Sequence, residues 1–209
     1  ALLQLGEEMA VDGKTPLFFA RGGQLIGVIA VADVVKPTSK QAIAELTGMG
    51  IEVVMLTGDN AKTAEAIRRQ VGVDRVVAEV FPQDKEKEIR RLQSAGKKVA
   101  MVGDGINDAP VLAGADVGAA MGSGADAAME AADVVFLNSD MDSIPTAIRI
   151  ARFTGRISKE NVIFALAVKA LIMILGLAGI ASMWLAVFAD TGVAMLCILN
   201  SIRILYKKQ

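Results

Sequence analysis

Apolar and polar positions are distributed in two different ways along the chain. Residues 1–158 carry almost all the charge, between short apolar runs, whereas 162–202 holds only two ionisable residues, Lys169 and Asp190. The second stretch has about twice the roughly 20 residues that a helix needs to cross a bilayer. Because soluble helices rarely lack a polar face over such a length, we predict a soluble part followed by membrane-spanning helices. The alternative is a pair of buried helices in a soluble protein.

The segment Leu177-Ala-Gly-Ile-Ala-Ser182, which is rich in small residues, divides the apolar stretch near its middle. The pattern predicts a helical hairpin, with spans near 161–179 and 183–204 and a tight turn close to residue 181. Basic residues flank both outer ends of this hairpin: Arg149, Arg152, Arg156, Lys159, Arg203, Lys207 and Lys208. The positive-inside rule then places both ends in the cytoplasm. We expect a multi-pass protein of a bacterial plasma membrane whose soluble part is cytoplasmic.

In the soluble part, the spacing of apolar positions switches between that of strands and that of helices. Two β-like runs, 17–20 and 25–31, are joined by Arg-Gly-Gly, which is typical of a hairpin turn, and Asp33–Pro37 follows as a hinge. Further strands are predicted at 51–56, 75–78, 98–102, 117–121 and 134–137, and helices at 37–49, 61–71, 83–95, 107–114 and 125–131. This alternation predicts an α/β fold with a doubly wound parallel sheet.

The composition excludes several classes of function. An apolar content of 53% excludes a disordered chain, and a net charge of −1 offers no basic surface for nucleic acid. One cysteine and no histidine exclude a disulfide framework, a cysteine-cluster zinc site and histidine acid–base chemistry. Any reaction must therefore use carboxylates, lysines, hydroxyls and backbone amides.

Two polar motifs follow predicted strands, where doubly wound sheets bind their ligands. Thr57-Gly58-Asp59-Asn60 comes directly after the apolar run that ends at Leu56. A hydroxyl and backbone amides beside the start of a helix suit a phosphate, although the same sequence also forms ordinary turns and helix caps. Lys85 begins a charged helix and could neutralise an anion, or it could be a solvated surface charge.

A third motif contains two carboxylates four residues apart. It runs from Met101 to Pro110 and includes Gly103-Asp104-Gly105 and Asp108. Glycines let the backbone turn sharply and approach a ligand closely. Two carboxylates, completed by phosphate oxygens and waters, are ligands that Mg²⁺ accepts. A role in turns and caps would explain Asp108 but not Asp104 between two glycines, so we predict a magnesium site.

The three motifs, in this order, resemble those of the haloacid dehalogenase superfamily. Met55–Asn60 and Met101–Pro110 together are similar to the phosphorylation domain of P-type ATPases, and the likeness extends through 122–133. The resemblance covers about 33–150 densely. One departure is small: this chain has Ala109-Pro-Val-Leu112 where the family usually has Ala-Pro-Ala-Leu.

The resemblance implies an enzyme in which an aspartate takes the γ-phosphate of ATP and loses it to water while ions cross the membrane. Its cofactors would be ATP and Mg²⁺. Thr57, Lys85 and Asn107 would bind the phosphoryl group, with Gly58 and Asp59 completing the phosphate loop. Asp104 and Asp108 would hold Mg²⁺ directly or through water. These roles agree with the dependence of phosphoryl transfer on positioning and charge stabilisation.

The largest departure is the nucleophile. The family carries it in an Asp-Lys-Thr-Gly-Thr motif, which this sequence does not contain. We expect it upstream of Ala1, in a missing N-terminal part of the same pump that is a partner of this chain, and we expect the chain alone to be inactive. The resemblance divides the chain into the end of a nucleotide-binding domain (1–32), a phosphorylation domain without its nucleophile segment (33–157) and two transmembrane helices (158–206). Two other hypotheses stay open: a membrane-anchored phosphatase of the same superfamily, and a non-catalytic membrane module that binds magnesium and phosphate.

The two ionisable residues of the apolar stretch lie at similar depth. Lys169 precedes residue 181 by 12 positions and Asp190 follows it by 9, which places them roughly 18 and 14 Å below the turn. Ionisable residues at such depth are costly and indicate a functional site with a partner. We therefore expect a pair in which Asp190 binds a transported metal and Lys169 replaces the metal after release. Plain mutual neutralisation is the structural alternative.

The residues around this pair indicate which ion is carried. The segments 161–169 and 188–192 resemble the zinc, cadmium and lead branch of heavy-metal pumps, which implies a divalent heavy-metal ion as the transported partner. The copper branch is the alternative, because Met195 and Cys197 follow Asp190, but its Tyr-Asn pair is absent. A carboxylate also suits a divalent ion better than Cu(I), which prefers sulfur.

Overall fold

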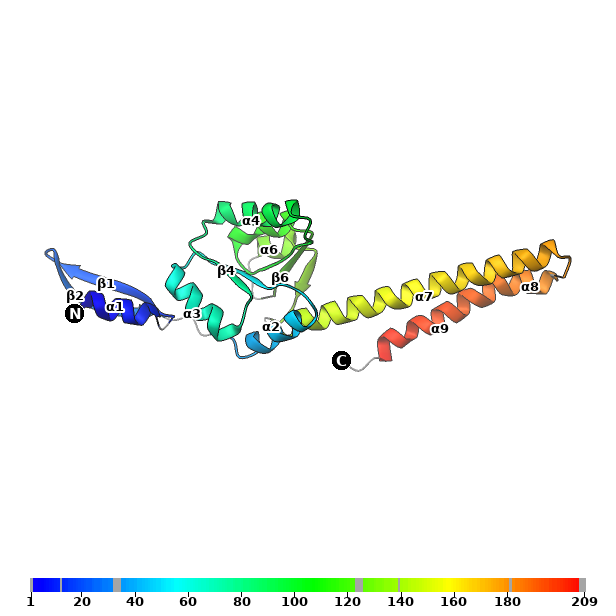
Figure 1. Cartoon of the computed structure of the whole chain (residues 1–209), viewed down its shortest axis with the longest axis horizontal. Helices are drawn as coiled ribbons and strands as arrows, with labels where there is room; N and C mark the ends of the chain where they lie inside the picture. The colour runs from blue at the N-terminus through cyan, green and yellow to red at the C-terminus, as the bar shows by residue number, and fades with distance from the viewer. Residues whose placement is uncertain are drawn as a thin grey trace. The chain divides into compact units, whose positions relative to one another are not determined.

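The structure is a computed structural model that describes residues 2–11, 13–31, 35–122, 126–138, 140–180 and 182–206 (Figure 1). The chain separates into two units, Ala1–Ser143 and Ile144–Gln209. The domain boundaries expected after residues 32 and 157 stay predictions. The hinge expected at Asp33–Pro37 lies partly outside the described residues, as does the turn expected at residue 181.

The first unit begins with a helix, α1 (Leu2–Val11), and an antiparallel hairpin of β1 (Thr15–Arg21) and β2 (Gln24–Val31). The predicted hairpin is confirmed. Its turn uses Gly22 and Gly23 at φ 59° and 78°, left-handed values that match the twist of the flanking strands. The helix was not predicted, because Gly6 weakens the local helical signal. A Cβ at Gly6 would collide with the ring of Phe18, so the glycine lets α1 pack closely on β1.

Strands and helices then alternate as predicted. The strands are β3 (Val54–Leu56), β4 (Arg75–Val77), β5 (Ala100–Gly103), β6 (Val117–Met121) and β7 (Val134–Phe136). The helices are α2 (Ser39–Gly48), α3 (Ala61–Val71), α4 (Pro82–Ser94), a 3₁₀ turn (Ile106–Asp108), α5 (Ala109–Gly114) and α6 (Asp126–Ala131). Figure 1 shows α4 and α6 on one side of the strands and α2 and α3 on the other. The α/β class is confirmed.

The parallel sheet is divided into two hydrogen-bonded parts. β3 pairs with β4, and β5, β6 and β7 form a second, three-stranded part. In the part of the chain that the structure describes, no strand ladder joins β3 to β5. Side-chain packing connects them instead, since Leu56 at the end of β3 packs against the core cluster that contains Met101 of β5. Among the described residues, β3 pairs only with β4, and β5 pairs only with β6.

Two apolar clusters hold the strand ends in place. The larger consists of Ile89, Met101, Val111, Leu112, Ala120 and Ala128. The smaller joins Ile43 of α2 to Val71 and Val73. Close packing of α5 on β6 requires Gly118, where a Cβ would lie 2.6 Å from the carbonyl oxygen of Leu112. These clusters fix the ends of β3 and β5, from which two of the polar motifs emerge.

The second unit is a helical hairpin. α7 (Ser143–Leu177) is one continuous helix that contains the basic residues between 149 and 159 as well as the first span. The second span comprises α8 (Met183–Val187), a π-helical turn labelled η2 (Phe188–Gly192) and α9 (Val193–Tyr206). Both spans are long and apolar enough to cross a membrane, with mean hydropathy values of 2.0 and 1.8. The two runs lie side by side in opposite directions (Figure 1).

Candidate functional site

The loop after β3 is held by its own side chains. The Thr57 hydroxyl donates to the Asp59 carboxylate at 2.7 Å and accepts the Asp59 backbone N–H at 3.1 Å. Asn60 then caps α3, because its side-chain oxygen accepts the Thr63 N–H at 2.9 Å. Gly58 is exposed between these anchors. The sequence therefore builds a rigid loop at a helix start, the arrangement that backbone amides need to bind a phosphate.

Glu79, after β4, supports the same loop from the neighbouring strand. Its backbone N–H donates to the Asp59 carbonyl at 2.9 Å, and its carboxylate accepts the Ala61 N–H at 3.4 Å. Glu79 has φ 57°, a left-handed conformation that is uncommon outside glycine. A non-glycine residue in this region costs about 1–3 kcal/mol, so the surrounding hydrogen bonds must hold it there. No pattern in the sequence predicts that Glu79 stabilises this loop.

Lys85, near the start of α4, and Asp108, in the loop after β5, form an ion pair. The Lys85 Nζ lies 2.7 Å from Asp108 Oδ1, and the two side chains are only 19% and 11% exposed. The other oxygen of Asp108 accepts the Gly105 N–H at 3.3 Å. A Cβ on Gly103 would lie 2.9 Å from the Asp108 Cβ, so glycine is needed for the carboxylate to fit. The structure thus brings together the lysine and one of the two predicted magnesium ligands.

Asp104 and Asn107 lie in the same loop, and both are exposed. Neither side chain forms a hydrogen bond or ion pair with another of the described residues. The side chains of Thr57 and Asp59 bond within their own loop, and no side-chain hydrogen bond between described residues connects them to the loop of Asp104 and Asp108. The predicted phosphate residues therefore form two groups, each at the carboxyl end of a different part of the sheet.

The carboxylates of Asp104 and Asp108 fit Mg²⁺ when other oxygens complete its shell. Among the described residues, no cluster of three or more His, Cys, Asp or Glu side chains could hold a metal by itself. Mg²⁺ usually keeps several waters and is bound by one or two carboxylates plus phosphate oxygens. Asp104 is exposed and Asp108 is held beside the Lys85 ammonium. The predicted magnesium site at this loop therefore stays a prediction, in which Lys85 would lie beside one of the two carboxylates.

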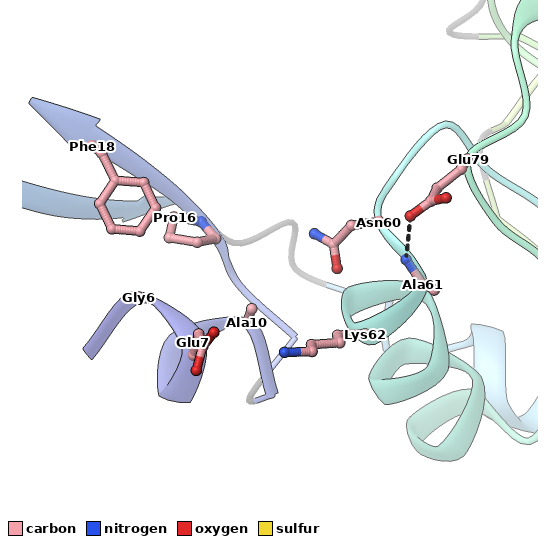
Figure 2. A pocket seen from close by; sticks show the side chains of 9 residues that line it. All are labelled: Gly6, Glu7, Ala10, Pro16, Phe18, Asn60, Ala61, Lys62 and Glu79. Atoms are coloured by element: carbon pink, nitrogen blue, oxygen red, sulfur yellow. Dashed lines mark hydrogen bonds between the residues drawn. The ribbon is translucent and has the colours of Figure 1, made fainter. Parts of the chain in front are cut away.

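A separate hollow of about 370 Å³ lies between α1, β1 and the start of α3 (Figure 2). Phe18 contributes to its wall from the hairpin, and Asn60 and Lys62 contribute from α3. It is open, and none of the residues predicted to bind phosphate or magnesium lines it. We assign it no part in the predicted chemistry.

The helical hairpin brings Lys169 and Asp190 together. The Lys169 Nζ lies 3.0 Å from Asp190 Oδ1, which agrees with their similar predicted depths. The side chains are 58% and 76% exposed, so the described residues leave both open to further ligands. Asp190 is the middle residue of the π-helical turn, a feature that the helical period of the sequence did not predict.

A polar cluster nearer the ends of the hairpin was also missed. The Asn161 side-chain amide donates to Ser201 Oγ at 2.9 Å, and Asn200 donates to the Asn161 side-chain oxygen at 2.8 Å. The Cys197 Sγ lies 3.7 Å from the Asn161 carbonyl oxygen. Polar residues at positions 197, 200 and 201 recur with helical spacing, which is the signal that could have revealed a shared face. These contacts join α7 to α9.

Two family models match the chain, and both are described as haloacid dehalogenase-like hydrolase. One matches residues 2–116 and the other matches 85–148. The first therefore covers more than half of the chain.

Individual relatives are metal-transporting ATPases. The chain is 44% identical, over 98% of its length, to a copper-exporting P-type ATPase of Bacillus subtilis (strain 168). It is 48% identical, over 87% of its length, to a cadmium, zinc and cobalt-transporting ATPase of the same strain. It spans 25% and 27% of the length of these two proteins. A crystal structure of a zinc-transporting PIB-type ATPase in the E2·Pi state matches 98% of the chain at 37% identity, with a TM-score of 0.88 and 34% of that chain covered.

Proposed function

Because the chain belongs to the haloacid dehalogenase-like hydrolase family, we propose that it is the C-terminal part of a P-type ATPase that exports Zn²⁺ or Cd²⁺. The predicted fold and membrane location agree with the relatives and are confirmed. The proposal adds the reaction, its residues and the ion. The observation that carries the choice of ion is the contact between Lys169 and Asp190 inside the apolar helices.

Phosphoryl transfer occurs at the carboxyl ends of β3 and β5 in this proposal. Lys85 neutralises the transferring phosphoryl group, and Thr57 and Asn107 donate hydrogen bonds to it. Gly58 and Asp59 shape the loop that presents backbone N–H groups. Such fixed donors and charges supply most of the catalysis in phosphoryl transfer. The aspartate nucleophile belongs to the N-terminal part of the pump, and ATP supplies the phosphoryl group.

Asp104 and Asp108 hold Mg²⁺, which balances the charge of the phosphate. Asp108 is paired with Lys85 at 2.7 Å, and its carboxylate would be one of the groups that hold the ion. The pair keeps the partly buried carboxylate and ammonium neutralised, since an unpaired buried charge is costly. The exposed carboxylate of Asp104 would be the second protein ligand of the ion.

Metal release uses the second Lys–Asp pair. With metal bound, the Asp190 carboxylate is a ligand, and after release the Lys169 ammonium returns to it at 3.0 Å. A carboxylate and a competing ammonium suit a divalent ion. The rest of the ligand shell and the cover from lipid come from helices of the N-terminal part.

Export of Cu(I) is the second candidate function. It is favoured by the 44% identity to the copper-exporting ATPase and by two sulfur-bearing residues after Asp190, Met195 and Cys197. Cys197, however, directs its sulfur to Asn161 at 3.7 Å. The carboxylate of Asp190 is a poor ligand for Cu(I).

The test is Asp190→Ala in the complete pump, with ATP hydrolysis measured against Zn²⁺, Cd²⁺ and Cu(I). We expect stimulation by Zn²⁺ and Cd²⁺ to disappear while phosphorylation of the enzyme by inorganic phosphate persists, because the phosphate site is intact. Glu160→Ala, which removes an exposed carboxylate of α7 before its apolar part, is the matched control. A wild-type pump stimulated by Cu(I) but not by Zn²⁺ or Cd²⁺ would favour the copper alternative.

A further inference from the structure

Asp190 lies in a π-helical turn, between two α-helical segments. The turn comprises Phe188–Gly192 and connects α8 to α9. π-turns carry an extra residue relative to an α-helix, give up regular hydrogen bonds and occur frequently at functional sites. Something in the local packing must therefore favour this turn over a continuous α-helix.

Gly192 and Phe188 fit together across the turn. A Cβ on Gly192 would lie 2.5 Å from Phe188 Cδ2, 2.8 Å from Cε2 and 3.2 Å from Cγ. The ring of Phe188 therefore occupies the space that any other residue at position 192 would fill. Because the atom at the base of the ring is also close, turning the ring about its own axis could not relieve the contact. Relief would need a new χ1 rotamer, and helices allow few of these.

The turn is anchored on a second side by buried residues. Ala189 and Val193 are 5% and 2% exposed, and they immediately precede and follow Asp190–Gly192. The Asp190 carboxylate, in contrast, is exposed and reaches the Lys169 ammonium on α7 at 3.0 Å. The ring contact and the buried pair together fix the backbone from which this carboxylate projects.

We propose that Gly192 is a positioning residue of the metal site, and that it acts through Phe188. Because Gly192 has no side chain, the phenyl ring of Phe188 can pack against the turn. The ring stabilises the π-helical conformation, in which the Asp190 carboxylate points towards Lys169. The proposal rests on the proposed function, in which Asp190 is the metal ligand. The metal is recognised by Asp190, and Gly192 sets the concentration at which it binds.

Helix propensity by itself predicts that replacing Gly192 does not harm the helix. Alanine is a better helix former than glycine, so Gly192→Ala should favour a regular helix. By helix propensity alone, the variant would be harmless or stabilising. Loss of metal affinity in a helix that folds at least as well would separate positioning from plain stability.

The experiment compares Gly192→Ala with Gly155→Ala in the complete pump. Both residues are in the helical hairpin, but among the described residues a Cβ at Gly155 would meet no atom within 4 Å apart from its chain neighbours and the backbone of its own helix. We expect Gly192→Ala to raise the Zn²⁺ concentration for half-maximal ATPase stimulation about tenfold, in line with the usual cost of overpacking. The maximal rate at saturating Zn²⁺ and phosphorylation by inorganic phosphate should change less than twofold, and Gly155→Ala should leave all three unchanged.

The same measurement in a Phe188→Ala background tests the mechanism. Phe188→Ala alone should raise the half-maximal concentration several-fold, since the ring no longer holds the turn. Adding Gly192→Ala to it should cost less than a further twofold, because the ring that collides with the new Cβ is gone. An equal cost of Gly192→Ala in both backgrounds would overturn the proposal.

The remaining outcomes separate this inference from the function on which it rests. Unchanged Zn²⁺ stimulation in Asp190→Ala contradicts the proposed function. Lost stimulation in Asp190→Ala, with Gly192→Ala indistinguishable from Gly155→Ala, contradicts only the role of Gly192. If Gly192→Ala does not accumulate in the membrane, Phe188→Ala alone decides, and an unchanged half-maximal concentration in that variant refutes the proposal.

Discussion

Two lysine–aspartate pairs, one in each unit of the protein, are similar in length but different in their surroundings. Lys85 and Asp108 meet at 2.7 Å with side chains that are 19% and 11% exposed, beside glycines that leave room only for this carboxylate. Lys169 and Asp190 meet at 3.0 Å with side chains that are 58% and 76% exposed, between two apolar helices. The first pair is enclosed by its own loops, and the second is open along one side of a hairpin.

This difference decides what each pair can do. Removing one partner of an enclosed pair leaves a charge without solvent, so Lys85 and Asp108 stay together until other charges replace them. An exposed ion pair in water contributes only about 0–1 kcal/mol, but charges facing lipid are costly. We therefore expect other helices of the complete protein to cover Lys169 and Asp190, and the pair to exchange easily with a metal ion.

The largest expected effect comes from breaking the enclosed pair. Lys85→Ala should lower ATP turnover of the complete protein by about a hundredfold or more, because a cation facing the transferring phosphoryl group is lost. Lys87→Ala is the control, since that lysine lies on the same helix and pairs with Asp84 at 2.6 Å at an exposed position. Turnover within twofold of the wild type in Lys85→Ala would refute the role given to this lysine.

Breaking the open pair should have a smaller and different effect. We expect Lys169→Ala to slow turnover at saturating Zn²⁺ about tenfold, because no ammonium displaces the metal from Asp190, while the half-maximal Zn²⁺ concentration stays equal or falls. Steady-state kinetics over a range of Zn²⁺ concentrations separates the two quantities. Lys159→Ala removes a charge before the same span and serves as the control. A higher half-maximal concentration would mean that Lys169 assists binding and not release.

The next effect concerns Asp104, the predicted magnesium ligand that forms no ion pair with another of the described residues. Asp104→Ala should weaken magnesium binding by the 209-residue chain about tenfold, since one of two carboxylates is removed. Magnesium titration in the presence of a phosphate analogue, followed by NMR of the loop amides, measures it. Asp126→Ala, at the exposed start of α6, is the control. Amides of Asp104 and Asp108 that do not move in the wild-type chain would contradict the magnesium site itself.

The smallest expected effect is a pH dependence of stability at Asp116, which pairs with Lys98. The Lys98 ammonium, the Val99 N–H and the Gln93 amide lower the pKa of Asp116 from 3.8 to about 2. Because the pKa is lower in the folded chain, the stabilisation is complete above about pH 4 and is lost as the pH falls towards 2. Asp116→Asn should therefore be less stable than the wild type at pH 5 and equal to it near pH 2.

Thermal unfolding followed by circular dichroism in detergent measures this difference. Glu8→Gln, a charge removal on α1, controls for the change in net charge. A gap between wild type and Asp116→Asn that stays constant from pH 5 to pH 2 would show that the charge of Asp116 does not contribute.

The sequence determined the order of elements and placed the candidate site residues after the strands. Alternation of apolar positions depends on the strand and helix periods, which are local, so β1 to β7 and both spans were predicted close to their observed places. Strand ends followed by glycines and carboxylates located Thr57, Asp104 and Asp108. The depths of Lys169 and Asp190 followed from helical rise alone.

Tertiary structure decided what depends on contacts between distant residues. It determined that α1 forms because Gly6 packs on Phe18, that β3 and β5 belong to separate hydrogen-bonded parts, and that Lys85 binds Asp108. It also determined the π-helical turn at Asp190, where the ring of Phe188 packs against the backbone of Gly192. Local patterns cannot reveal such features, because each is selected by the fit of side chains that only the fold brings together.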